Sequence, residues 1–205
     1  MTTIILPGMG ADSTMYPEKH FSRLTGISFA EWPEYKNESS IQAVAERVIE
    51  EYVINKKMIV GGSSLGGVVA IQIAKITGIK KVILIGSATH PKYINPMLQK
   101  LSVISGMAPV KFLQFLAGKI NYTGKSVIST MFEKSDSRFI KAMPKALLDW
   151  EGIGGYKGII CHIHGQLDRV IYPPCSNVEI IPAGGHVISM THGEVVAQYI
   201  KKNTN

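Results

Sequence analysis

The sequence alternates short apolar runs with helical stretches along nearly its whole length, and this alternation constrains the fold more than any other feature. Six runs have the length and composition of buried strands, at residues 4–8, 27–32, 58–62, 81–85, 158–164 and 177–181. Strands that are apolar almost throughout, rather than at every second residue, are typical of a parallel sheet covered by helices on both faces. We therefore expect an α/β fold.

Helices are predicted between these strands, and the clearest follows a pair of serines. Its apolar residues recur at the spacing of a helix with one buried face, and they are Ile41, Val44, Ala45, Val48, Ile49 and Tyr52. The stretch 66–77 is apolar nearly all round, which predicts a buried helix that ends at Gly78. Asp12 and Ser13 should cap a helix that runs to about Leu24. A closing helix is expected to bury a stripe of Val195, Val196, Tyr199 and Ile200.

The composition limits the protein to a few classes. The chain has 205 residues, of which 45% are hydrophobic and 18% charged, and this suits one domain, residues 1–205, with its own core. No apolar run approaches the roughly 18–20 residues that a membrane span needs. The opening MTTIILPGMG lacks the basic segment of a signal peptide, and two cysteines cannot form a disulfide framework. We expect a soluble, cytoplasmic protein with no membrane partner.

One connection between strands is much longer than the others. More than seventy residues separate Ile85 from Gly158, whereas a crossover between parallel strands needs only about 10–12. Much of this segment has helical patterns, at 96–106, 110–118 and 136–150. The last of these contains Pro144, which should kink or divide it. We interpret residues 89–150 as a helical lid above the sheet, and the alternative is covering helices with no gating role.

A serine motif lies between the predicted strand 58–62 and the buried helix after it. Gly62-Ser63-Ser64-Leu65-Gly66 matches Gly-X-Ser-X-Gly, in which a tight turn lifts the central serine above the carboxyl end of a strand. The glycines are needed because side chains there would collide with neighbouring backbone. Ser64 is the candidate nucleophile, and Ser63 is not, because a leucine stands where its second glycine would be. The alternative is a glycine-rich helix entry with a structural role only.

The residues that would activate this serine follow two later strands. A serine hydroxyl becomes nucleophilic when a base takes its proton and an acid orients that base. His186 lies on a glycine-rich loop after the last predicted strand, and Asp168 lies just after the strand 158–164. All three residues follow the carboxyl ends of strands, where open α/β sheets place their sites, and their chain order is serine, acid, histidine. We expect Ser64, Asp168 and His186 to form a catalytic triad.

Two backbone N–H groups are candidates for binding an oxyanion. The N–H of Leu65 directly follows the candidate nucleophile. The second donor should come from the loop after the first strand, where glycines on either side of Met9 leave its N–H free to face a substrate. We expect Met9 and Leu65 to form the oxyanion hole, although the same loop is also an ordinary turn from strand to helix.

His162 and His164 share one face of a predicted strand and raise the question of a metal. The zinc-hydrolase pattern His-X-His-X-Asp-His needs an acid and a histidine directly after Gly165, where Gln166 and Leu167 stand. We therefore expect no metal and no cofactor.

Four segments, LPGMGADS, GGSSLGG, HGQLDRVIYP and PAGGH, together resemble the α/β-hydrolase superfamily, and they are spread over nearly the whole chain. The resemblance is strongest to its small lidded carboxylesterases and acyl-carrier esterases. It implies a helical lid, a Ser-Asp-His triad and an acyl-enzyme. The antiparallel hairpin usual before the first strand is missing and the lid is short. Both departures imply a minimal sheet of about six parallel strands in the order 2-1-3-4-5-6.

These observations predict a serine hydrolase that acts on carboxylic esters or thioesters. Two alternatives remain: other chemistry on the same triad, such as C–C bond hydrolysis or a lyase reaction, and a hydrolase-like binding module without activity. No motif supports a nucleic-acid partner. The apolar residues of the predicted lid should line an acyl pocket or simply dock the lid, and they include Met97, Leu101, Phe112, Phe115, Met131 and Met143.

The positive charge of the chain is concentrated in the predicted lid. Residues 89–150 hold nine basic and three acidic residues, which accounts for almost all of the net charge of +7. This predicts an anionic partner at the entrance, namely a CoA or phosphopantetheine thioester, an acyl-carrier protein or an anionic ester. The alternative is a solvated basic face, since lysines are common on exposed helices.

Overall fold

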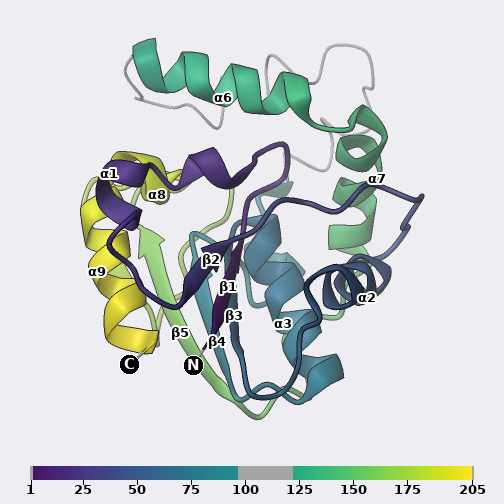
Figure 1. Cartoon of the computed structure of the whole chain (residues 1–205). Coiled ribbons are helices and arrows are strands. Elements are labelled where there is room, and N and C mark those ends of the chain that lie inside the picture. Colours follow the sequence, from purple (N-terminus) through teal and green to yellow (C-terminus); the bar gives the residue numbers. More distant parts are fainter. Residues whose placement is uncertain (1, 97–121, 205) are drawn as a thin grey trace.

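The computed structural model of the chain describes residues 2–96 and 122–204, and within them six strands form one parallel sheet (Figure 1). The strand order is β2-β1-β3-β4-β5-β6. The strands are β1 (Thr3–Leu6), β2 (Ile27–Phe29), β3 (Ile59–Ser63), β4 (Lys81–Ile85), β5 (Ile159–Gly165) and β6 (Glu179–Ile181). The predicted fold class and strand order are confirmed.

Helices cover both faces of this sheet (Figure 1). The described helices are α1 (Glu18–Phe21), α2 (Ile41–Tyr52), α3 (Leu65–Thr77), α6 (Tyr122–Lys134), α7 (Ser137–Leu148), α8 (Ile188–Thr191) and α9 (Gly193–Thr204), with short 3₁₀ turns at Ser13–Met15 and Pro91–Tyr93. In Figure 1, α2, α3 and α7 lie on one face, and α1, α8 and α9 lie on the other. None of the described helices is long and apolar enough to cross a membrane.

Each central strand is buried on both faces, which explains its apolar sequence. In β4, Val82 and Leu84 pack with α2 and α3, whereas Ile83 and Ile85 pack with α8 and α9. Successive side chains of a strand point to opposite faces of the sheet, so a strand with helices on both sides needs apolar residues at every position.

Three element predictions are corrected by the structure. The helix expected from Asp12 to about Leu24 is a 3₁₀ turn followed by the separate helix α1, because Pro17 between them has no N–H to continue a helix. The edge strands β2 and β6 are shorter than predicted. In α9, Val196, Tyr199 and Ile200 are buried as expected, but Val195 is 42% exposed. The buried residues of α9, Gly193, Val196, Ala197, Tyr199 and Ile200, lie on one side of the helix, and Val195 points away from that side.

The long connection between β4 and β5 contains α6 and α7, which lie in different places. Helix α7 packs beside α2 through Phe139, Met143 and Ala146, and it runs through Pro144 without being divided. Helix α6, which the sequence did not predict, lies above the carboxyl ends of the strands (Figure 1). The helices predicted at 96–106 and 110–118 lie almost wholly outside the described residues.

Candidate active site

Ser64 stands in a strained turn between β3 and α3. Its φ of 51° and ψ of −118° place a residue other than glycine at positive φ, a conformation that costs energy and is concentrated at functional sites. A Cβ atom on Gly62 would lie 2.4 Å from the carbonyl carbon of Gly66, and a Cβ on Gly66 would lie 2.4 Å from the carbonyl oxygen of Pro7. Both glycines of the motif are therefore required by close backbone contacts.

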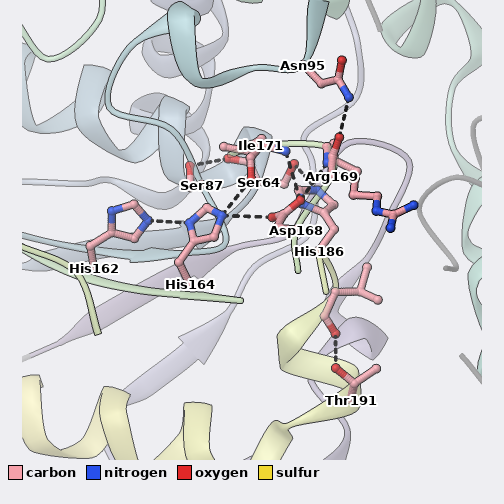
Figure 2. A network of polar contacts seen from close by, with 12 residues as sticks. Ser64, Ser87, Asn95, His162, His164, Asp168, Arg169, Ile171, His186 and Thr191 are labelled. Carbon is pink, nitrogen blue, oxygen red and sulfur yellow. Dashed lines mark hydrogen bonds and ion pairs between the residues drawn. The ribbon is translucent and has the colours of Figure 1, made fainter. Parts of the chain in front are cut away.

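Three side chains from distant parts of the chain meet at this turn (Figure 2). Nε2 of His186 lies 3.0 Å from Oγ of Ser64, and Nδ1 of His186 lies 2.8 Å from Oδ2 of Asp168. The loops that carry Asp168 and His186 are joined by backbone hydrogen bonds from Gln166 to Ile181 and from Leu167 to Gly184. The structure thus brings together the serine, acid and histidine singled out from the sequence.

Asp168 is buried and fully hydrogen-bonded. Its Oδ1 accepts the backbone N–H groups of Val170 and Ile171 at 2.8 and 3.0 Å. Burial by itself raises the pKa of Asp168, but the charge of His186 and the hydrogen bonds from His164 and His186 outweigh burial and hold that pKa well below its usual range. The carboxylate is therefore ionised, and it can hold Nδ1–H of His186 and stabilise an imidazolium.

The loop after β1 lies directly beside Ser64. A Cβ atom on Gly8 would lie 3.6 Å from Cβ of Ser64. The loop is held by the indole N–H of Trp32, which donates to the carbonyl of Gly8 at 2.9 Å, and by the N–H of Gly8, which contacts Sδ of Met15 at 3.1 Å. Neither the N–H of Met9 nor that of Leu65 donates a hydrogen bond to another described residue. Both remain available to an oxyanion.

Comparison with known proteins finds similarity to solved structures only. No protein-family model and no curated protein matches the chain. A lipase-esterase related protein from Clostridium acetobutylicum has a TM-score of 0.80 at 14% identity, covering 98% of this chain and 93% of that one. An enol-lactonase from Burkholderia xenovorans has a TM-score of 0.79 at 13% identity, with coverages of 98% and 90%. For a thermophilic esterase from Thermogutta terrifontis these values are 0.77, 16%, 98% and 88%.

The chain has the α/β-hydrolase fold. In this α/β-hydrolase fold the candidate site lies at the carboxyl ends of β3, β5 and β6, as expected for an open parallel sheet. The other serine of the motif, Ser63, is buried, and its Oγ lies 2.9 Å from the hydroxyl of Tyr16, so it does not face the site as Ser64 does.

In this α/β-hydrolase fold, two residues that the sequence analysis did not single out support the backbone around the candidate site. The hydroxyl of Ser87, two residues after β4 ends, donates to the carbonyl of Ser64 at 2.6 Å and supports the strained turn. The hydroxyl of Tyr16 donates to the carbonyl of Leu6 at 2.7 Å, which ties the 3₁₀ turn to the end of β1. No local pattern marks either residue, because the partner of Ser87 lies 23 residues away in sequence and that of Tyr16 lies ten residues away.

His162 and His164 are the other residues whose role the sequence left unassigned. Among the described residues there is no group of three or more histidine, cysteine, aspartate or glutamate side chains placed to hold a metal ion. Instead, Nε2 of His164 lies 3.0 Å from Oδ2 of Asp168, and Nδ1 of His164 lies 3.0 Å from Nε2 of His162. Their alternation toward one face of β5, just before Asp168, is the signal that could have indicated this contact.

Of the predicted pocket residues, Met97, Leu101, Phe112 and Phe115 lie outside the described part of the α/β-hydrolase fold. Met143 is fully buried in the core cluster of α2 and α3, the position of a residue that docks α7. Met131 is buried in the cluster that contains Met15 and Tyr16, next to the loop after β1. Helix α6 also reaches this loop, because a Cβ on Gly10 would lie 2.6 Å from the ring of Phe132.

Proposed function

We propose that this chain is a serine hydrolase that cleaves carboxylic esters or thioesters through an acyl-enzyme. The observation that carries the proposal is the continuous contact from Ser64 Oγ through His186 to Asp168, at 3.0 and 2.8 Å, on a strained turn at the carboxyl end of the sheet. These are the distances at which a base takes a proton from a nucleophile and is in turn oriented by an acid. Gly62 and Gly66, where an added Cβ atom would collide with backbone, form the same turn.

The proposed reaction uses this geometry directly. Nε2 of His186 takes the proton of Ser64 Oγ as the oxygen attacks the carbonyl carbon of the substrate. The N–H groups of Met9 and Leu65 donate to the oxyanion of the tetrahedral intermediate. The imidazolium, stabilised by Asp168, then gives its proton to the leaving alcohol or thiol. A water activated by His186 releases the acid from the acyl-enzyme and regenerates Ser64.

The structural neighbours support hydrolysis in general and leave the substrate open. Their descriptions name an esterase, a lipase-esterase related protein and an enol-lactonase. Identities of 13–16% transfer the fold and not the substrate, since one fold hosts many reactions.

For the substrate we propose an acyl group of short or medium length, linked to an anionic carrier such as CoA or an acyl-carrier protein. Met131, beside the loop after β1, supports an apolar acyl site. Lys134, Arg138 and Lys141 are exposed on α6 and α7 and support an anionic carrier. Of these three, Arg138 is already paired with Asp136, so Lys134 and Lys141 carry most of this support. The solvated basic face is the competing explanation.

The test is a panel of esters and thioesters of increasing acyl length, assayed with the wild type and with Ser64→Ala. We expect hydrolysis by the wild type and a loss of roughly 10⁴-fold or more in the variant, as for other triads that lose the nucleophile. Ser63→Ala is the matched control, because it removes the neighbouring hydroxyl and should keep most of the activity. A fluorophosphonate should label wild type and Ser63→Ala at Ser64 and leave Ser64→Ala unlabelled. Full turnover by Ser64→Ala would overturn the proposal.

A further inference from the structure

The hydrogen-bonded chain at the candidate site does not end at Asp168. Behind the carboxylate, Nε2 of His164 lies 3.0 Å from Oδ2 of Asp168, the same oxygen that contacts His186 (Figure 2). Nε2 of His164 also lies 2.9 Å from the carbonyl of Ile171. The side chains of His164 and Asp168 are both 0% exposed, so water does not replace either contact.

The partners of His164 determine where its hydrogens lie. Its Nε2 contacts two oxygen atoms that only accept hydrogen bonds, so this nitrogen carries a hydrogen and donates to them. Its Nδ1 shares one further hydrogen with Nε2 of His162 at 3.0 Å. Burial, together with the proximity of His164, lowers the pKa of His162 to about 3, so His162 is uncharged at neutral pH.

No other ionisable side chain faces this pair from the adjacent strands in the described part of the chain. His162 is in register with Leu84 of β4, and His164 is in register with Ile180 of β6. Among the described residues, the titratable groups in contact with His164, directly or through one partner, are His162 on its own strand, Asp168 on the loop after β5, and His186 beyond Asp168.

We propose that His164 is a positioning residue that acts through Asp168 on the base His186, with His162 holding its ring. The inference rests on the proposed function, because it assigns His164 a part in the same reaction. Oδ2 of Asp168 accepts from His164 and His186 together, and a carboxylate that loses one donor attracts the remaining one more strongly. Without His164, His186 therefore protonates at a higher pH, and the carboxylate loses a contact that restrains its orientation.

Two substitutions separate this role from simple packing. In His164→Gln the amide nitrogen falls near the place of Nε2 and still donates to Asp168, whereas in His164→Asn it falls near Nδ1 and cannot reach the carboxylate. For His164→Asn we expect kcat on an ester to fall about ten- to hundredfold, the usual effect of removing a hydrogen bond to a charged group, while KM changes little. The acidic limb of the pH profile of kcat/KM should move up by roughly one pH unit. His164→Gln should restore most of kcat and return the acidic limb close to its wild-type position.

The protonation of His186 is also measured without turnover, by ¹⁵N NMR titration of the imidazole signals in each variant. We expect its midpoint to rise in His164→Asn and to return in His164→Gln. An unchanged midpoint and acidic limb in a folded His164→Asn would overturn the inference, even if kcat fell, because packing alone would then explain the loss. His164→Leu repeats the test if the asparagine variant does not fold. If the wild type hydrolyses no ester or thioester, the proposed function fails, while the NMR comparison still decides the role of His164.

Discussion

At Ser64 the backbone takes up a positive φ that only the surrounding contacts make possible. The turn is held from three sides: the N–H of Ser64 donates to the carbonyl of Ile85 at 3.1 Å, the hydroxyl of Ser87 donates to the carbonyl of Ser64 at 2.6 Å, and Gly66 lies against Pro7. Strain of this kind persists where neighbouring structure over-determines a residue, and here it presents Oγ to His186.

We expect Gly66→Ala to lower the free energy of unfolding by about 2–3 kcal/mol, because the new Cβ would overlap backbone that cannot rotate away. The Cβ would lie 2.4 Å from the carbonyl oxygen of Pro7. Gly154→Ala is the matched control, since nothing lies within 4 Å of its Cβ. Urea denaturation of both variants measures the difference, and equal stabilities would contradict the close contact.

The buried His162 should make the stability of the protein depend on acid. Folded His162 stays neutral down to its pKa of about 3, whereas an unfolded histidine protonates near pH 6.5. Between these values the unfolded state binds the additional proton, so the free energy of unfolding falls as the pH falls, by at most about 1.4 kcal/mol per pH unit. Folding lowers the pKa of Asp168, so this residue also reduces the free energy of unfolding as the pH falls, but only below about pH 4.

His162→Gln removes the titrating group and keeps a polar side chain. We expect its free energy of unfolding, measured with urea at several pH values from 7 to 4.5, to fall less steeply with acid than that of the wild type. Parallel curves for the two proteins would show that His162 does not titrate as the structure indicates.

Among the elements, α2 forms from local signals as well as from packing. Its residues Ile41, Val44, Ala45 and Val48 are buried against α3 and the sheet, and the side chain of Ser40 accepts the N–H of Ala43 at 3.1 Å. The loops after β5 and β6 differ from this helix, because the backbone hydrogen bonds between them have their partners far apart in sequence. The position of Asp168 and His186 therefore depends on the assembled sheet.

We expect Ser40→Ala to destabilise the protein by about 1 kcal/mol, because the first turn of α2 loses its N-cap. The adjacent Ser39 is exposed and makes no hydrogen bond to a described residue, so Ser39→Ala should change the stability by less than about 0.5 kcal/mol. Thermal or chemical unfolding of the two variants gives the comparison. A Ser39→Ala loss as large as that of Ser40→Ala would indicate that α2 is not capped by Ser40.

In the whole molecule the two ends of the strands differ in what surrounds them. The candidate site occupies the carboxyl ends, and the segment 89–150, with most of the net charge of +7, follows the carboxyl end of β4. The amino ends carry their own exposed lysines, among them Lys56, Lys57 and Lys80. A field from the basic segment attracts anionic substrates over about 10 Å at moderate salt, so its position decides whether it acts on catalysis.

If the basic segment steers an anionic substrate, kcat/KM for a CoA thioester should fall severalfold as salt rises, while that for a neutral ester stays nearly constant. We expect the triple variant Lys134→Gln, Arg138→Gln and Lys141→Gln to lower kcat/KM for the thioester and flatten its salt dependence. The charge-matched control replaces Lys56, Lys57 and Lys80 with glutamine. It should leave kcat/KM for the thioester and its salt dependence unchanged. Equal effects of the two triple variants would show that the basic segment is a solvated face that does not steer the substrate.

The sequence by itself determined the features that depend on neighbouring residues. Strands apolar at every position must be buried on both faces, so the parallel sheet could be predicted from alternation, and the helices α2, α3, α7 and α9 from their own apolar patterns. The turn at Ser64 was predictable for a similar reason, since Gly62 and Gly66 report close backbone contacts within a few residues and to the adjacent strand. Asp168 and His186 were found because each directly follows a strand.

Only the tertiary structure decided the features that depend on partners far away in sequence. The side of α9 that Val195 faces, the contact of Ser87 with Ser64, and the place of His164 behind Asp168 follow from how strands and helices pack, which periodicity does not specify. Alternation placed His162 and His164 on one face of β5 and raised the question of a metal, which Gln166 and Leu167 answered against, but it named no other partner for the two rings. The folded loop places the carboxylate of Asp168 there, and this carboxylate gives the buried imidazole of His164 the hydrogen-bond partner that it needs.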